Sequence, residues 1–243
     1  MHERRWLKTK DPADLKSIFA PTAYVLSQLP IISKRDGVQG YWYTYPNETW
    51  FLTFHTDRNA GIESAKKTWN PILEKIAIFP GVQKPITQYT NFPNFKSMFD
   101  ALLGPLEAPI SAEKRSLPVM HPMMKDPDIA RFRRHTNELE EVYPRGIIGL
   151  DSRLLGEKHL SSPQLEAALR DSMPQGEYGM LRGHLMAGNQ VLKTGVNETS
   201  VNPSWRSAWI HLIGTGEAPN ITAVKNLAPD MGCYANEVNL TVF

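Results

Sequence analysis

An alternating aromatic run between Gly40 and Thr56 constrains the fold of this chain more than any other stretch of its sequence. Tyrosines occupy every second position from 41 to 45, a Pro-Asn-Glu loop follows, and an apolar run returns from Trp50 to His55. A period of two is typical of strands, and two such runs around a short loop predict a β-hairpin. An aromatic cluster of this kind indicates sheet packing more often than ligand stacking.

The other segments predict strands and helices without regular strand–helix–strand units. Helical spacing predicts helices over 11–29, 59–76, 92–103, 126–141 and 217–227, and a further helix opens at the Ser-Ser-Pro of 161–163. Strands are predicted at 85–90, 146–152, 179–191, 205–213 and, after a turn at 229–232, at 233–238. The expected fold class is α+β, a large antiparallel β-sheet with helices on one face.

Two of these elements carry expectations about side-chain direction. The helix over 92–103 is expected to face inward through Phe95 and its helical neighbours at 98, 99 and 102. The strand at 205–213 is expected to place Trp205, Trp209 and His211 on one face.

Composition excludes several classes of function. The net charge of +2 gives no general attraction to nucleic acid or to a membrane surface, and no apolar run reaches the roughly 18 residues of a spanning helix. A single cysteine, Cys233, excludes an internal disulfide, and the seven histidines show no metal-binding spacing, so no metal site is expected. The first residues lack the apolar stretch of a signal peptide.

The stretch from Leu227 to Val238 is where the sequence places the chemistry. Tyr234, Asn236 and Glu237 bring a phenol, an amide and a carboxylate together within four residues. A partly buried Glu can act as a general base. Spacing alone more often marks a solvent-exposed Glu and a packed Tyr, so both interpretations stay open at this point. No Gly-rich phosphate loop and no Gly-x-Ser-x-Gly elbow occurs.

Five segments form an ordered set that extends over nearly the whole chain. They are Gly-Tyr-Trp-Tyr-Thr-Tyr-Pro at 40–46, Asp-Ser-Arg-Leu-Leu at 151–155, Gly-His-Leu-Met-Ala-Gly at 183–188, Val-Asn-Pro-Ser-Trp-Arg-Ser-Ala at 201–208 and Ala-Pro-Asp-Met-Gly-Cys-Tyr-Ala-Asn-Glu at 228–237. In this order they resemble the berberine-bridge-type FAD-linked oxidoreductases of the vanillyl-alcohol-oxidase flavoprotein superfamily, particularly the fungal members. The specificity lies in the ordered set and not in any one segment.

The resemblance implies a domain that covers the isoalloxazine ring of FAD. On this reading residues 1–243 are a single substrate-binding domain, 105–145 are a Pro-rich excursion, and 227–243 are a truncated form of the family's C-terminal segment. The family's FAD-binding domain is absent from this sequence. We therefore expect a fragment of a fungal-type enzyme of secondary metabolism that does not retain flavin as an isolated chain.

The resemblance also assigns roles to residues. Tyr234 and Asn236 match positions that face the substrate and the flavin, and Glu237 matches the position of the base in the fungal pattern. The implied reaction is oxidation of a small molecule by hydride transfer to the flavin, which dioxygen reoxidises. Two alternatives remain: a non-redox small-molecule binding module, and a partner chain that completes a separate FAD-binding domain.

Overall fold

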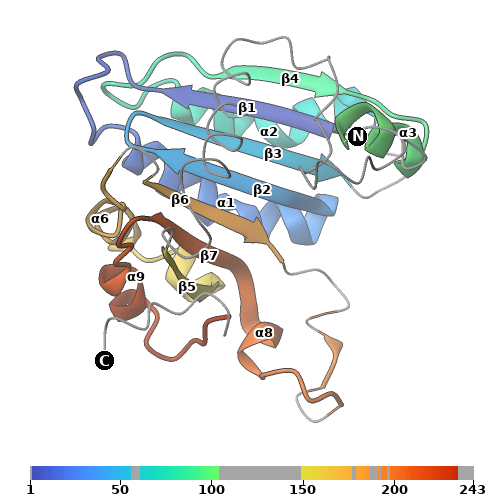
Figure 1. Cartoon of the computed structure of the whole chain (residues 1–243). Helices are drawn as coiled ribbons and strands as arrows, with labels where there is room; N and C mark the ends of the chain where they lie inside the picture. The colour runs from blue at the N-terminus through green and yellow to red at the C-terminus, as the bar shows by residue number, and fades with distance from the viewer. Residues whose placement is uncertain are drawn as a thin grey trace, which may run out of the picture. The chain divides into compact units, whose positions relative to one another are not determined.

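The computed structural model describes residues 2–55, 61–103, 149–176, 179–186, 191, 193–195 and 198–234. The chain divides into two compact units, Met1–Thr90 with Ile148–Phe243, and Asn91–Ile147. The first unit contains a seven-stranded sheet with the order β4-β1-β3-β2-β6-β7-β5 (Figure 1). All six neighbouring pairs are antiparallel, so the expected α+β fold with a large antiparallel sheet is confirmed.

The bounds of the elements are as follows. The strands are β1 (His2–Lys8), β2 (Val38–Tyr45), β3 (Glu48–His55), β4 (Ile86–Thr90), β5 (Gly149–Gly156), β6 (Met180–Leu185) and β7 (Ala208–Gly216). The helices are α1 (Phe19–Asp36), α2 (Ile62–Ile76), α3 (Phe95–Leu103), α5 (Glu157–Leu160), α6 (Leu165–Asp171), α8 (Ser204–Ser207) and α9 (Thr222–Leu227). Helix α3 lies in the second unit, and the other elements lie in the first.

The predicted hairpin forms the centre of the sheet. Strands β2 and β3 pair from Val38↔His55 to Tyr45↔Glu48. At Gly40 φ is 151°, a conformation that favours glycine, and an added Cβ would collide with the backbone of β3. The hairpin is therefore fixed both by its alternating side chains and by a glycine that lets the two backbones approach.

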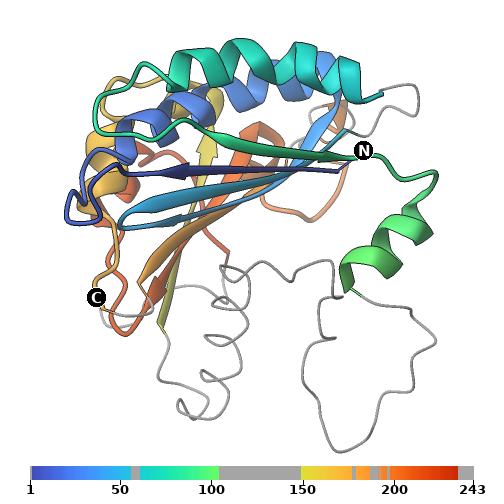
Figure 2. The same ribbon diagram turned by 90° about the horizontal axis from the view of Figure 1, so that it is seen from above.

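Helices α1 and α2 lie across one face of this sheet (Figures 1 and 2). The core between the two layers is apolar and closely packed. It includes Leu26 and Trp69 from the helices and Leu7, Trp42 and Phe51 from the strands, none more than 2% exposed. Burial of this kind contributes about 25 cal/mol per Å² of apolar surface, so this face supplies most of the stability of the sheet.

The prediction for the first helix was wrong at both ends. The carboxylates of Asp11 and Asp14 accept hydrogen bonds from backbone N–H groups two or three residues later, which makes turns instead of a helix. Helix α1 begins only at Phe19, so that Pro21 falls in its first turn, where a missing N–H costs nothing. It runs on to Asp36 and ends at Gly37, whose φ is 65°.

Other predictions differ from the structure in detail. Strand β1 was not predicted. The segment 204–207 is helix α8, because the Asn202 side chain accepts a hydrogen bond from the Ser204 N–H and starts a turn there. Trp205 therefore lies outside the strand, and Trp209 is approached by Lys34 of α1. Phe95 is 72% exposed and does not face inward.

Several predictions lie wholly or partly outside the described residues. They include the excursion at 105–145 with its polar helix, parts of the predicted strands at 146–152 and 179–191, and the part of the predicted final strand that follows Tyr234. Residues 233 and 234 of that strand are described, and neither forms part of a strand. Within the described ranges no helix has both the length and the apolar character that crossing a membrane requires.

Candidate functional site

The two faces of the sheet differ in what they carry. Burial alternates residue by residue along β2, β3 and β6, with one face fully buried and the other partly exposed. We call the buried one the helix face; it carries Trp42, Phe51, Leu181 and Leu212. The partly exposed one, the tyrosine face, carries Tyr41, Tyr43, Trp50, Arg182 and His184. Aromatic and cationic side chains on a face that is not fully buried indicate a surface with a ligand or a partner.

Strand register brings three rings into one row on the tyrosine face. Tyr41 of β2 pairs with His184 of β6, and His184 pairs with His211 of β7. Their ring centroids are 5.0 Å apart for Tyr41 and His184 and 5.7 Å apart for the two histidines. Both pairs meet edge to face, the arrangement that aromatic quadrupoles favour.

Two further rings extend this row at the β7 end. Trp205 of α8 and Tyr234 lie 5.5 and 6.0 Å from the ring of His211, and 6.4 Å from each other. We call the five residues Tyr41, His184, Trp205, His211 and Tyr234 the aromatic cluster. The cluster contains residues from four of the five segments that carry the family resemblance. These segments are 40–46 in the hairpin, 183–188, 201–208 and 228–237.

The fifth of these segments, on β5, holds the chain that leads to Tyr234. The N–H of Leu154 donates to the carbonyl of Gly232 at 2.9 Å, and the N–H of Tyr234 donates to Ser152 Oγ at 3.2 Å. The Arg153 guanidinium donates to two consecutive carbonyls, those of Ala228 and Pro229. The Ser-Arg-Leu motif is thus a docking strip for residues 228–234.

A buried histidine fixes the start of the same segment. His159 Nδ1 accepts a hydrogen bond from the N–H of Gly156, so the proton is on Nε2, which donates to Asp230 Oδ1 at 2.9 Å. Lys158 also pairs with this carboxylate at 2.8 Å. The Lys158 and His159 contacts lower the pKa of Asp230 to about 2. Asp230 is therefore ionised at neutral pH, and it anchors the segment to α5.

Arg182 affects titratable neighbours on the tyrosine face, including His211 and Tyr43. It pairs in register with Tyr43 on β2 and with Ile213 on β7. Burial, and next the charge of Arg182, lower the pKa of His211 to about 4, so this imidazole is neutral at pH 7. Burial also raises the pKa of Tyr43, although Arg182 opposes that shift. The part of this face around β2, β6 and β7 therefore combines the neutral ring of His211 with the positive charge of Arg182.

The predicted site residues fall partly within the described part of the chain. Tyr234 lies in the aromatic cluster, with 45% of its surface exposed. Asn236 and Glu237 lie outside the described residues. Sequence reasoning missed His184 and His211, because it searched the histidines only for metal spacing. Among the described residues, no group of three His, Cys, Asp or Glu side chains is placed to hold a metal ion.

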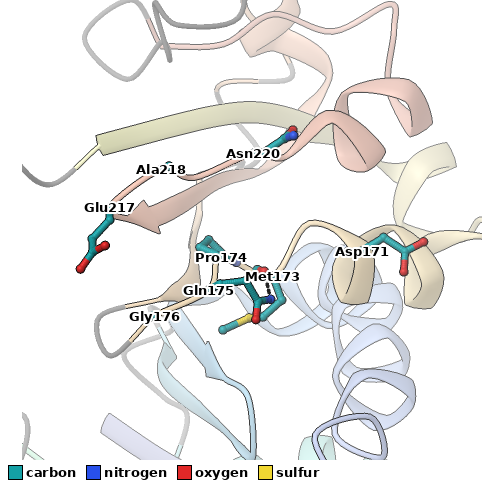
Figure 3. A pocket seen from close by; sticks show the side chains of 8 residues that line it. All are labelled: Asp171, Met173, Pro174, Gln175, Gly176, Glu217, Ala218 and Asn220. Atoms are coloured by element: carbon teal, nitrogen blue, oxygen red, sulfur yellow. Dashed lines mark hydrogen bonds between the residues drawn. The ribbon is translucent and has the colours of Figure 1, made fainter.

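A separate hollow lies elsewhere, at the end of β7 beyond Gly216 (Figure 3). Its volume is about 370 Å³, and it is open to solvent. Its lining is short of aromatic rings, and the Gln175 amide is already occupied by the carbonyl of Met173 at 3.0 Å. It is lined by Asp171, Met173, Pro174, Gln175, Gly176, Glu217, Ala218 and Asn220. We place the candidate site on the tyrosine face, where rings, charge and the docked 228–234 segment meet.

Comparison with known proteins connects this arrangement to flavoproteins. No protein-family model matches the chain. An uncharacterised FAD-linked oxidoreductase of Arthroderma benhamiae is 27% identical over 257 residues, which cover 96% of this chain and 38% of the relative. The chain therefore spans about two fifths of the length of this relative.

Solved structures share the fold. A VAO-type flavoprotein of Myceliophthora thermophila superposes with a TM-score of 0.70 at 16% identity, over 98% of this chain and 41% of that one. The BBE-like 1 protein of Physcomitrella patens gives 0.54 at 13% identity, over 98% and 46%. The fold is thus that of part of the VAO-type and BBE-like flavoproteins, and the sequence relative confirms the resemblance to FAD-linked oxidoreductases that the motifs carry.

Proposed function

We propose that this chain is the substrate domain of an FAD-linked oxidoreductase and that its tyrosine face lies against the isoalloxazine ring. The aromatic cluster carries the proposal. It gathers five rings on one sheet face, and Tyr41 and Tyr234 are 42% and 45% exposed. Aromatic contacts add roughly 0.5–1.5 kcal/mol each beyond the area that they bury, so a flat ring system gains by covering this face.

The residues present fit the ring of the cofactor, and they leave its phosphates to another part of the protein. Tyr41, Tyr43 and Trp50 offer ring faces and edges to a flat heterocycle. The sequence contains no Gly-rich loop to hold a pyrophosphate. When bound, FAD supplies two-electron oxidation of a small-molecule substrate, with dioxygen as the final acceptor. The chain itself supplies orientation, exclusion of water and a proton acceptor.

We assign the proton acceptor to Glu237, with Tyr234 and Asn236 facing the flavin and the substrate. The support is the docking of residues 228–234 on β5, which fixes Tyr234 in the cluster only three residues before Glu237. A Glu237→Gln variant, tested with the FAD-binding domain supplied, should lose about 10²-fold or more in turnover with unchanged flavin content. Full turnover by that variant would exclude Glu237 as the base.

The domain assignment is part of the same proposal. Residues 1–243 act as one substrate-binding domain, with 105–145 as a Pro-rich excursion and 227–243 as a berberine-like C-terminal segment. The match to about two fifths of the Arthroderma relative supports a fragment of a fungal-type enzyme. We place that enzyme in secondary metabolism because the resemblance is to the fungal members of the class. Its FAD-binding domain then lies on another stretch or another chain.

Titration with lumiflavin, the isoalloxazine ring without its phosphate tail, tests the flavin-facing role. A ring of about 19 non-hydrogen atoms at roughly 0.3 kcal/mol per atom gives a Kd on the order of 0.1 mM. We expect quenching of lumiflavin fluorescence by the purified chain and weaker quenching by Tyr41→Ala. Tyr24→Ala is the matched control, because it removes a partly buried tyrosine from α1 in the helix layer. Equal binding by all three proteins would contradict the proposal.

The alternatives predict different outcomes in the same experiments. A non-redox binding module would take up an aromatic small molecule but not lumiflavin. A partner chain would acquire flavin only when it co-purifies with a separate FAD-binding protein. The isolated chain should pass through gel filtration without absorbance near 450 nm, since the site for the phosphates is not in its sequence.

A further inference from the structure

Arg182 is the feature of the tyrosine face that a flavin ring alone does not explain. It lies on β6 between Tyr43 and Ile213, in the middle of the sheet. Its Nε is buried, and within the described part of the chain this atom has no hydrogen-bonding partner. A partly desolvated guanidinium without a carboxylate is costly to fold, so such groups are normally paired or await a ligand.

Other charged side chains described on this face, namely Arg4, Lys8 and Glu48, lie in other rows of the sheet than Arg182. Glu48, near Tyr45, pairs with Lys8 at 3.3 Å. On the opposite side of the sheet, Arg5 donates to Thr53 and lies over the ring of Trp69. Arg153 is held by the carbonyls of Ala228 and Pro229. Arg5 and Arg153 each donate hydrogen bonds within the fold, whereas no such bond to another described residue holds the Arg182 guanidinium.

The neighbours of Arg182 define the kind of ligand. Tyr43 lies directly opposite it, and His184 and His211 lie on the same face. These rings suit the flat body of an aromatic molecule, and the guanidinium suits an anionic oxygen in a charge-assisted, two-pronged contact. The ligand class is an anionic oxygen attached to a flat ring. Two sources fit this chemistry, namely a substrate carboxylate and the reduced flavin ring.

We infer that Arg182 is the recognition residue for the carboxylate of an aromatic acid substrate. This inference rests on the proposed function, since it places the substrate on the same tyrosine face as the flavin. It narrows the substrate class from any small molecule to aromatic compounds that carry a carboxylate. Neutral analogues are then discriminated by the loss of one charge-assisted contact.

Binding of benzoate and benzyl alcohol to the purified chain, followed by tryptophan fluorescence at constant ionic strength, tests the inference. We expect benzoate to bind about tenfold more tightly than benzyl alcohol, because only benzoate reaches the guanidinium with a charge. Arg182→Gln should reduce the preference to less than about twofold, and Arg182→Lys, which keeps the charge but loses the fork, should retain part of it.

Arg4→Gln is the matched control. It removes the same charge from the same face of the sheet, at a position of β1 that lies in the row of Tyr41. Strands β3 and β2 separate β1 from β6, so the two strands are about 14 Å apart at ordinary strand spacing. The control should keep the preference. An absent preference in the unmodified chain, its survival in Arg182→Gln, or its equal loss in Arg4→Gln would each overturn the inference.

Two further measurements separate this inference from its rivals. Arg182→Met should unfold at the same or a higher urea concentration than the unmodified chain, since a ligand-binding charge is held at a cost to stability. Failure of Arg182→Met and Arg182→Gln to fold would show a structural role and overturn the inference. An effect of Arg182→Gln on dithionite-reduced lumiflavin but not on benzoate would assign the residue to the flavin. Normal lumiflavin binding with no benzoate preference would overturn this inference alone and leave the proposed function standing.

Discussion

The helix face and the tyrosine face are formed by the same strands, often by consecutive residues. They differ in burial and in the kinds of side chain that they carry. Trp42 is 1% exposed beneath the helices, whereas its neighbour Tyr41 is 42% exposed on the other side. The helix face is mostly apolar, with Arg5 and several threonines buried among its apolar side chains, while the tyrosine face carries imidazoles, phenols and guanidinium groups, most of which are partly exposed. The difference indicates that packing against α1 and α2 stabilises the sheet, while the proposed binding surface lies on the opposite face.

The largest expected effect is on the helix face. Trp42→Ala should lower the free energy of unfolding by about 3–5 kcal/mol, because it removes a large buried ring and leaves a cavity that the strands cannot close. Urea unfolding followed by circular dichroism measures the change. A loss below 1 kcal/mol would mean that the helix face is not the stabilising one.

The docking of residues 228–234 gives an intermediate effect. His159→Ala removes the acceptor of the buried Gly156 N–H and the donor to Asp230, which should cost about 1–3 kcal/mol. Hydrogen exchange of the Tyr234 amide, which is bonded to Ser152 Oγ, should accelerate as the segment loosens. Asp230→Asn, which keeps an acceptor for His159, is the control and should accelerate exchange less.

Protonation of His211, on the tyrosine face, should make the free energy of unfolding depend on pH. Its folded pKa of about 4 lies below the unfolded value near 6.5, so the unfolded chain binds more protons between these values. Stability is therefore fully present above pH 6.5 and falls as the pH drops toward 4, by roughly 1–2 kcal/mol once solvent screening is allowed for.

Urea unfolding between pH 7 and 4.5 measures this slope, and His211→Gln should flatten it. Arg182→Gln should raise the pKa of His211 in the folded chain, because one of the two causes of the shift is removed. The pH range over which stability changes should then become narrower. A slope that His211→Gln leaves unchanged would place the titrating group elsewhere.

The strands and contacts that could be predicted from the sequence are those whose pattern lies within one continuous stretch. The β2–β3 hairpin was predicted because its alternation and its turn lie within one stretch. Strand β1 was missed because one of its inward residues is Arg5, whose burial depends on the ring of Trp69 in a distant helix. The pairing of His184 with His211 likewise requires the register of β6 on β7, which no local pattern shows.

The segments that carry the family resemblance show the same limit, because the sequence does not reveal the contacts between them. The sequence placed the Ser-Arg-Leu segment and the stretch ending at Tyr234 in the right family order. Only the structure shows that the Ser-Arg-Leu segment on β5 binds residues 228–234, since the contacts join residues 75 or more positions apart. Asn236 and Glu237 remain predictions from the sequence.

The smallest expected effect on stability is at Tyr41. Tyr41→Ala should change the free energy of unfolding by less than about 1 kcal/mol, because 42% of the residue is exposed and its removal leaves no enclosed cavity. The same variant should weaken lumiflavin binding, and this contrast with Trp42→Ala separates the two faces most sharply. A strongly destabilised Tyr41→Ala chain would remove the distinction.

The central claim is that a flat ring binds to the tyrosine face, and NMR titration of the isotope-labelled chain with lumiflavin tests it most directly. The account predicts that ring-current shifts will concentrate on the tyrosine face and around Tyr234, including Tyr41, Tyr43, Arg182, His184 and His211. The resonances of Leu26 and Trp69 in the helix layer, and of the hollow around Gln175, should stay in place. Shifts centred on the helix layer or on that hollow would contradict the account.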